Sequence, residues 1–457
     1  NFFAVHNIDF NKAWKAKQSG WHDQTRAIFA NAEIGWKSMI YLTATGRNDW
    51  DSRLAFSDYK SFFYPSIGLS AILTSMFNAP DWLTYLKVRG SYTEVGNSYG
   101  RFMTTVTYPY DEQTQNWTNT SSYPNTKLKP ERTKSWEVGL DARILNDISL
   151  NLTYYRSNTY NQTFYADLSL SSGYSNIPIQ SGNIMNEGLE MSLGYNKQWK
   201  DFSFNTNYTL TWNKNRVKRL ADGVYNYATG QPIQMPELSP LTYGHTDARL
   251  ILRVGGSMGD VYGQRLLKRD LNGYILNEEG VGLAMENKET YLGSILPKMN
   301  MGWSLGFGYK GVNLGMTFTG RFGGIVISET QSVLDAAGVS KVSADVRDAG
   351  GVQINQSKVS AQTYYQTIQG TAAYYTYSAT NIRLGELSLS YTLPKKWFDN
   401  KVGMTVGLVG KNLWMIYCKA PFDPELTTSA ASNFYQGFDA YMLPSTRNFG
   451  FNVKFQF

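Results

Sequence analysis

The side chains best suited to chemistry are few and widely separated. The three histidines are His6, His22 and His245, and their spacing fits neither a zinc site nor a nucleophile–base pair. Cys418 is the only cysteine, so no internal disulfide can form. Asp and Glu occur throughout the chain, but no pair is supported by a third catalytic residue type. We therefore expect a protein that is not an enzyme.

One segment has the beginning of a calcium loop. Asp270 and Asn272 occupy positions 1 and 3, and an EF-hand loop then requires an oxygen ligand at position 5 and glycine at position 6. Here those positions hold Tyr274 and Ile275. Because the ligand set is broken, we expect a turn without metal and no cofactor, with calcium at Asp270 and Asn272 as the weaker alternative.

The strongest pattern in the chain is its last stretch. Apolar side chains occupy every second position and small or polar ones lie between them, which is the period of a β-strand with two different faces. The apolar face consists of Phe449, Phe451, Val453, Phe455 and Phe457. A strand of a membrane barrel requires such a face, because lipid contacts one side and water the other. The alternative is the last strand of a soluble β-sandwich.

Similar alternation recurs along the chain. In the segment 202–213, Phe204, Tyr208 and Trp212 share one face, and Ser, Asn and Thr fill the other. In 382–393 the phase slips by one residue near Gly385, which predicts a β-bulge. About thirteen strands of roughly ten residues are predicted. They begin near Arg26, Ser38, Ser61, Leu83, Lys134, Asp147, Asn186, Asp201, Met299, Val312, Asn381, Lys401 and Ser445.

Composition agrees with a barrel. The chain has 457 residues, 15% of them aromatic, and its longest nearly apolar run, 67–77, is too short for a membrane helix of about 18 residues. The net charge of +7 is scattered, so nucleic acid is not an expected partner. Short and long connections alternate, as periplasmic turns and extracellular loops do in outer-membrane barrels. Tryptophans at the short turns predict an aromatic girdle; they are Trp36, Trp82, Trp199 and Trp397.

Strand parity predicts an incomplete barrel. The first and last strands both run toward the short-turn side, whereas a complete barrel has an even number of strands and begins in the other direction. No linker or composition shift divides the sequence. We therefore expect residues 1–457 to be the C-terminal portion of a single all-β transmembrane barrel domain, with earlier strands upstream.

Several motifs in order resemble one family. The chain resembles the C-terminal half of SusC/RagA-type TonB-dependent transporters of the Bacteroidetes outer membrane over about 27–457. The matching segments are 41–50 (YLTATGRNDW), 63–68 (FYPSIG), 86–97 (LKVRGSYTEVGN), 123–129 (YPNTKLK), 186–190 (NEGLE), 383–394 (RLGELSLSYTLP), 410–413 (GKNL), 423–425 (DPE) and 444–447 (PSTR).

The resemblance implies a barrel of about twenty-two strands with an N-terminal plug, both partly or wholly absent from this chain. It implies active import of a large nutrient, a glycan or an oligopeptide, across the outer membrane. Implied partners are a SusD-like surface lipoprotein as a lid, the TonB–ExbB–ExbD complex as energy source, outer-membrane lipid, and a second transporter–lipoprotein pair. It also implies that the terminal Phe face serves as a membrane-assembly signal.

Candidate contact residues follow from the same resemblance. Aromatic side chains in loops can stack on sugar rings, and the candidates are Trp117, Tyr123, Tyr374, Tyr375, Tyr377, Phe434 and Tyr435. Loop packing or contact with the lipoprotein is the alternative for each. Lys87 and Arg89, on the polar face of their strand, are expected to line the lumen or contact the plug.

Two other functions fit less well. A passive porin would have a complete even-stranded barrel without a plug. A soluble glycan-binding β-protein would bury the aromatic strand faces in a core and expose the polar faces.

Overall fold

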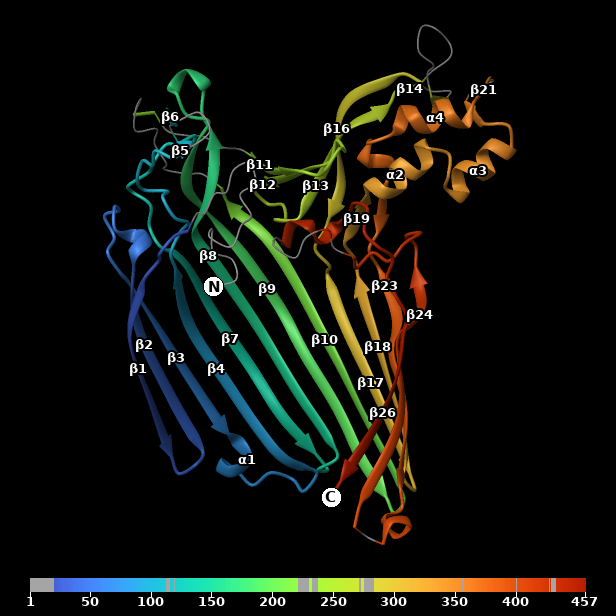
Figure 1. Ribbon diagram of the computed structural model, residues 1–457. Helices are drawn as coiled ribbons and strands as arrows, with labels where there is room; N and C mark the ends of the chain where they lie inside the picture. The colour runs from blue at the N-terminus through green and yellow to red at the C-terminus, as the bar shows by residue number, and fades with distance from the viewer. Residues whose placement is uncertain are drawn as a thin grey trace, which may run out of the picture.

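The structure is one curved antiparallel sheet of thirteen strands, with most of the smaller elements at one end (Figure 1). The computed structural model describes residues 20–111, 116–118, 120–220, 230–231, 237–270, 273–274, 283–354, 357–399, 401–426, 428 and 433–457. Each strand pairs with the next in chain order among the thirteen. They are β1 (Thr25–Trp36), β2 (Ile40–Asp51), β3 (Phe62–Ile72), β4 (Leu83–Asn97), β7 (Glu131–Ile144), β8 (Ile148–Asp167), β9 (Asn176–Trp199), β10 (Phe202–Arg219), β17 (Met299–Tyr309), β18 (Val312–Phe322), β23 (Asn381–Leu393), β24 (Gly403–Cys418) and β26 (Asn448–Gln456).

The sequence prediction of the strands is confirmed in number and, except for β9, in position; β9 begins at Asn176, ten residues before the predicted start near Asn186. The expected length of about ten residues is wrong for four strands, because β8, β9, β10 and β24 have 20, 24, 18 and 16 residues. β8, β9 and β10 stay paired with one another well beyond the length that spans a bilayer. Within the described residues, β1 and β26 form the two edges of the sheet. The total of twenty-two strands and the upstream plug stay predictions.

The two faces of the sheet differ as the alternation requires. Directly opposed residues share a face, so the pairs Tyr208–Trp303 and Trp303–Phe318 form an aromatic row across β10, β17 and β18. The rings of Trp303 and Phe318 are 5.8 Å apart. On β26, Phe449 and Phe451 are each 79% exposed. No second layer covers this face in the described part of the chain, so the soluble β-sandwich alternative is wrong.

Short connections gather at one end of the sheet and long ones at the other (Figure 1). The hairpin between β17 and β18 consists of Lys310 and Gly311 alone, with φ of +46° and +89°; this left-handed pair of residues is what a two-residue turn requires. The predicted bulge is present, since the register shifts at Gly385 against both neighbouring strands. The predicted girdle tryptophans are about half exposed near the short turns.

The long connections are folded rather than irregular. The connection between β10 and β17 contains a four-stranded sheet of β11 (Glu237–Thr242), β12 (Arg249–Arg253), β13 (Asp260–Leu267) and β16 (Met285–Ser294). The connection between β18 and β23 contains β19 (Ile325–Ser328), α2 (Glu329–Ala336), α3 (Lys341–Asp348), α4 (Ala361–Ile368) and β22 (Thr376–Ser378). β19 also pairs with β25 (Phe438–Asp439) of the last long connection. Smaller elements of the long connections are β5 (Tyr110–Asp111), β6 (Asn116–Trp117), β14 (Arg269–Asp270), β15 (Gly273–Tyr274), β20 (Val352–Ile354) and β21 (Ser357–Val359). The short helix α1 (Leu73–Met76) lies at the other end, in the short connection between β3 and β4.

Local signals explain the three longer helices. Each begins after a serine whose hydroxyl accepts a hydrogen bond from a backbone N–H in the first turn: Ser328, Ser340 and Ser360. Eight residues make a helix too short to persist alone, so tertiary packing must hold it. None of the helices in the described ranges is both long enough and apolar enough to cross a bilayer.

The apolar cores lie in the long connections. One cluster centres on Tyr243, Ile295, Ile327 and Phe438, all of which are almost completely buried. A second joins Leu267 and Tyr375 to the helices. The molecule therefore buries apolar side chains in its loops and exposes them on its sheet, which is the distribution expected when lipid replaces a core on one face of the wall.

The lipid-facing assignment of β26 can be tested by introducing a charge. We expect Phe451→Arg, opposite Leu408 and midway along the strand, to destabilise the full-length protein in bilayers by about 2–4 kcal/mol, since arginine is that costly near the midplane. Asn452→Arg, one residue further on and opposite Gly407, is the matched control and should change stability little. Reversible urea unfolding in lipid measures both; equal costs would contradict the assignment.

Candidate functional site

The ladder between β10 and β17 opens near the long-loop end of the wall. Regular pairing stops at Trp212 opposite Met299, and the Asn213 N–H then donates to the Lys298 carbonyl at 3.1 Å. Four residues on, the loop at Gly256 closes the gap again, because the Val217 N–H donates to the Gly256 carbonyl at 2.8 Å. Among the residues that the structure describes, no strand pairs with the edge of β10 between these two links.

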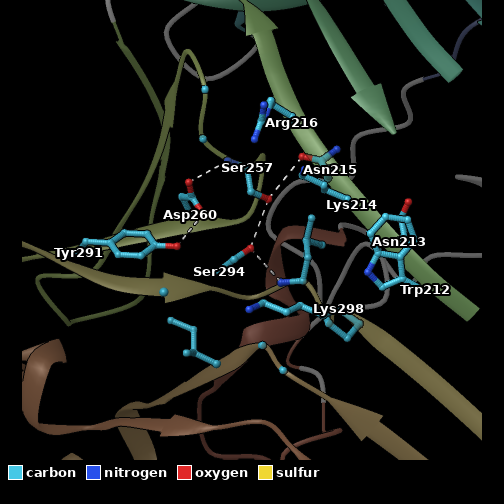
Figure 2. A pocket seen from close by; sticks show the side chains of 18 residues that line it. Trp212, Asn213, Lys214, Asn215, Arg216, Ser257, Asp260, Tyr291, Ser294 and Lys298 are labelled. Atoms are coloured by element: carbon cyan, nitrogen blue, oxygen red, sulfur yellow. Dashed lines mark hydrogen bonds between the residues drawn. The ribbon is translucent and has the colours of Figure 1, made fainter. Parts of the chain in front are cut away.

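A cavity of about 590 Å³ fills this opening (Figure 2). One wall is the free edge of β10, and the others come from the turn 255–257, the end of β16, the segment 296–298 and the glycines that follow β18. These segments are up to about 110 residues apart in sequence, and the loop sheet brings them together. The main polar residues of the lining are Asn213, Lys214, Asn215, Arg216, Ser257, Asp260, Tyr291, Ser294 and Lys298.

Hydrogen bonds hold one side of the cavity in place. Asn215 Oδ1 accepts from the Met258 N–H at 2.7 Å and from the Ser257 hydroxyl at 3.4 Å. The Ser294 hydroxyl donates to Ser257 Oγ at 3.3 Å. The lining therefore presents hydroxyl and amide groups in fixed positions, which suits a polar ligand.

Asp260 is the acidic residue of the cavity and is only 7% exposed. Burial raises its pKa, and hydrogen bonds from the Ser257 N–H at 2.8 Å and the Tyr291 hydroxyl at 3.2 Å partly oppose this effect. Three cations line the same space: Lys214, Arg216 and Lys298. Lys214 has Glu187 as a partner at 3.7 Å, whereas Arg216 and Lys298 have no side-chain hydrogen bond or ion pair within the described residues.

Glycines keep the cavity open. At Gly256 an added Cβ would lie 2.6 Å from an Asp260 carboxylate oxygen, so no larger residue fits beside that carboxylate without displacing it. Gly293 has a φ of +136° and lies close to Ile325, where only glycine is unstrained. The lining therefore offers hydrogen-bond donors and acceptors around an open space.

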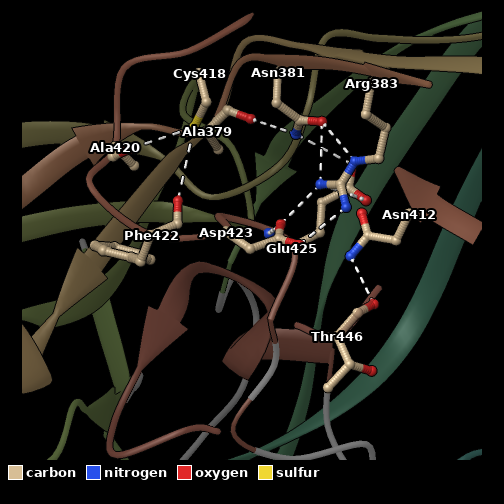
Figure 3. A network of polar contacts seen from close by, with 10 residues as sticks. All are labelled: Ala379, Asn381, Arg383, Asn412, Cys418, Ala420, Phe422, Asp423, Glu425 and Thr446. Atoms are coloured by element: carbon tan, nitrogen blue, oxygen red, sulfur yellow. Dashed lines mark hydrogen bonds and ion pairs between the residues drawn. The ribbon is translucent and has the colours of Figure 1, made fainter. Parts of the chain in front are cut away.

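A buried ion pair ties the last long connection to the wall (Figure 3). The Arg383 guanidinium on β23 donates to both carboxylate oxygens of Asp423, at 2.7 and 2.9 Å, and Glu425 lies 3.2 Å away. Burial alone would raise the pKa of Asp423, but the hydrogen bonds from Arg383 and the Glu425 N–H outweigh it, so this pKa lies below its usual value. Asn412 adds a second link by donating to the Thr446 carbonyl at 3.2 Å.

Most of the aromatic candidates pack within the loops. Tyr375 is 2% exposed in the second core, where Tyr374 and Tyr377 also pack. Phe434 and Tyr435 pack on the first core, and the Phe434 carbonyl accepts the Tyr243 hydroxyl at 2.7 Å. Their ring stacking on a sugar stays an untested prediction, and packing is the role that these contacts support.

Trp117 and Tyr123 pack against different aromatic partners. Trp117 is 71% exposed on β6 and lies 5.1 Å from the ring of Tyr110, whereas Tyr123 makes an edge contact with Tyr174 at 5.1 Å. Of the aromatic candidates, Trp117 leaves the most ring surface open to a ligand.

Lys87 and Arg89 lie on the polar face of β4, where the lumen is expected. Arg89 donates to Asp141 at 2.7 Å and to the Thr153 hydroxyl at 2.6 Å, across Gly139, where a Cβ would lie 2.7 Å from the Arg89 Nε. Lys87 is opposite Asp141 in the register. Contact with a plug stays a prediction.

The calcium alternative is not tested. Asn272 and the side chain of Asp270 lie outside the described residues. Among the residues that are described, no group of three or more His, Cys, Asp or Glu side chains is arranged to hold a metal ion.

The residues of the cavity were missed by sequence reasoning. Ser257, Asp260 and Ser294 lie in a segment that was expected to be a long loop. The signal available was the pairing of glycines at 255–256 and 323–324, which marks close backbone approach but does not say which segments meet.

Comparison with known proteins identifies the family of the chain. Residues 6–413 match the family model described as TonB dependent receptor-like, beta-barrel. TonB-dependent receptor P3 of Formosa agariphila is 25% identical over 468 residues, covering 94% of this chain and 45% of that protein. TonB-dependent receptor SusC of Bacteroides thetaiotaomicron is 24% identical over 217 residues, covering 47% of this chain and 19% of that protein.

The fold has a solved counterpart. The RagAB peptide importer in its open-open state matches with a TM-score of 0.71 at 20% identity, over 95% of this chain and 46% of that one. The chain thus spans about half the length of the full-length relatives it matches. With the two-faced wall and the family match together, the chain belongs to the TonB-dependent receptor-like β-barrels, receptors and transporters of the bacterial outer membrane.

Proposed function

We propose that the protein forms part of an active importer that carries a large nutrient, a glycan or an oligopeptide, across the outer membrane. The observation that carries the proposal is the polar cavity at the long-loop end of the wall, between the free edge of β10 and the loop sheet. Its hydroxyl, amide and cationic groups are suited to the hydrogen-bonding groups that both nutrient classes share. Likeness to the RagAB peptide importer supports the oligopeptide class, and the glycan class follows from the resemblance to SusC/RagA-type transporters.

The partners are part of the same proposal. A SusD-like lipoprotein would cover the long-loop end, and TonB–ExbB–ExbD would supply energy through the part of the transporter that lies outside this chain. Likeness to SusC and to RagAB supports both partners, and two transporter–lipoprotein pairs would form the complete assembly. A passive porin is the alternative, and it requires neither a lid nor an energy source.

The cavity can be tested in the full-length transporter in its own bacterium. Lys298→Ala combined with Ser294→Ala removes a cation and a hydroxyl from the lining; we expect the half-saturation concentration for uptake to rise roughly tenfold, as the loss of one or two polar contacts predicts. Lys310→Ala, at the opposite end of the wall, is the control. Separate feeding with labelled oligosaccharides and labelled oligopeptides identifies the class.

The same cells separate active from passive transport. Collapsing the proton-motive force should abolish uptake of the labelled nutrient while the protein stays in the outer membrane. Uptake that continues at an unchanged rate would make the protein a porin, whereas energy-dependent uptake that the double variant leaves unaltered would move the binding site away from the cavity.

The Arg383–Asp423 pair should hold the last long connection in position. We expect Arg383→Gln to destabilise the local fold by about 3 kcal/mol, because Asp423 is left buried without its cation. Hydrogen exchange of residues 419–426 and limited proteolysis measure the opening. Lys341→Gln, which breaks the exposed pair with Asp345 on α3, is the control and should leave this segment protected.

The pair also has a predictable pH dependence. Since the folded pKa of Asp423 is below its usual value, the pair contributes its full stability at neutral pH and loses it as the pH falls below about 4. Exchange of the segment should therefore rise on acidification in the wild type. An Asp423→Asn variant should show a smaller rise, because only Glu425 then remains as a carboxylate partner of Arg383, and the same acid response in both proteins would exclude Asp423 as its origin.

A further inference from the structure

Basic side chains gather on the lipid-facing side of the wall, just beyond its aromatic residues. In the register, Trp136 is opposite Arg156, Arg156 is opposite Glu187, and Glu187 is opposite Lys214. Opposed residues project from the same face, so these charges share the face of Trp136. We name as the outer basic patch the five cations on this face of β7, β8 and β10: Arg132, Lys134, Arg156, Lys214 and Arg216.

The patch lies at the height of lipid headgroups. Phe202 begins β10 next to a short turn, and Trp212 is on the same face about ten residues later. At roughly 3.3 Å per residue and a tilt of about 40°, this separation spans about 25 Å, the height of the apolar band of an outer-membrane barrel. Lys214 and Arg216 are the next two outward positions, so they lie beyond the hydrocarbon on the long-loop side.

The charges of the patch are only partly balanced. Glu94 lies 3.1 Å from Arg132 and 3.2 Å from Lys134, and Glu187 lies 3.7 Å from Lys214. Arg156 and Arg216 have no ion pair or side-chain hydrogen bond within the described residues. Two carboxylates among five cations leave a surplus of positive charge on a surface that faces the membrane.

Among the described strands, the patch does not extend to β17 and β18. On β17 and β18 the outward positions are apolar or glycine from end to end; they are Met299, Met301, Trp303, Leu305, Phe307, Tyr309, Val312, Leu314, Met316, Phe318, Gly320 and Phe322. A general adaptation to a charged membrane surface would place cations all around the barrel. Five cations on neighbouring strands are suited to the headgroup of a single ligand.

We infer that the outer basic patch binds the phosphorylated headgroup of a lipid in the outer leaflet. The acyl chains would lie along the exposed aromatic face below, and the phosphate would lie between Arg156 and its neighbours. Arginine suits this role because its planar fork donates two parallel hydrogen bonds to a phosphate, and basic clusters at a membrane surface attract anionic lipids.

The bound lipid would also touch the binding cavity from outside. Lys214 and Arg216 belong to the patch and to the lining of the cavity, because the free edge of β10 separates the two. A lipid held there would fix the part of β10 that has no neighbouring strand. This role does not depend on which nutrient is imported.

The test uses the full-length protein in nanodiscs of phosphatidylcholine, titrated with lipid A or with the same lipid after enzymatic removal of its phosphates. Lys134→Gln combined with Arg156→Gln removes two cations that do not line the cavity. We expect this variant to bind phosphorylated lipid A at least roughly tenfold more weakly in native mass spectrometry, as the loss of two cations at an anionic surface predicts. Lys310→Gln, near the other end of the strands, should bind like the wild type.

Two further titrations distinguish a phosphorylated lipid from other ligands. The affinity of the wild type for the dephosphorylated lipid should be no higher than the affinity of the double variant for phosphorylated lipid A. Inorganic phosphate at millimolar concentration should not compete with lipid A for the wild type. Equal binding of both lipids would overturn the proposal, as would competition by free phosphate, which would indicate a soluble-anion site. Arg156→Lys retains the charge and should restore part of the affinity; correct folding of each variant is verified by its heat-modifiable electrophoretic mobility.

Discussion

Backbone hydrogen bonding inside the bilayer is the constraint from which the rest of the structure follows. No water is available there, so each N–H and C=O group of the wall must pair with a neighbouring strand. In the described part of the chain, one continuous antiparallel ladder meets this requirement for the eleven inner strands, whereas β1 and β26 are each paired on one side only. Each side chain of the ladder projects either toward lipid or toward water. Apolar rows such as Tyr208 and Trp303 therefore alternate along the strands with polar residues on the opposite face.

The constraint ends where the hydrocarbon ends, and the functional features begin at that level. β9 and β10 continue to pair as far as Arg219, but β17 leaves the ladder at Met299, so the edge of β10 becomes free. The loop at Gly256 closes the gap above it, and the cavity occupies the space between. The pattern of burial also reverses between the wall and the long connections. Phe451 on the wall is exposed to lipid, whereas Tyr243 and Phe438 are packed in a core above it.

This division explains how much the sequence could predict. Period-two alternation is strong wherever one face meets lipid, so the strands, the girdle tryptophans and the bulge at Gly385 were all identified from residue types. The loop elements lack such a signal: α2, α3 and α4 have eight residues each and depend on serine caps and tertiary contacts. Tyr375 has the same local composition whether it packs in a core or stacks on a ligand, and only contacts with residues far away in sequence decide between the two. The cavity combines Asn215 with Ser294, which no local pattern relates.

Arg383 shows how the wall and the loops are joined. Two register irregularities flank it against β24, one before Arg383 and one at Gly385, where Asn412 adopts a φ of +53°. Such bulges twist a strand and redirect its side chains, and here Arg383 reaches the carboxylate of Asp423 above the wall. Asn412 of the same bulge holds Thr446, two residues before β26 begins. A one-residue slip of β26 would turn its Phe face toward water. The irregular site in the ladder therefore fixes both ends of the last long connection, and through them the register in which the terminal strand meets lipid.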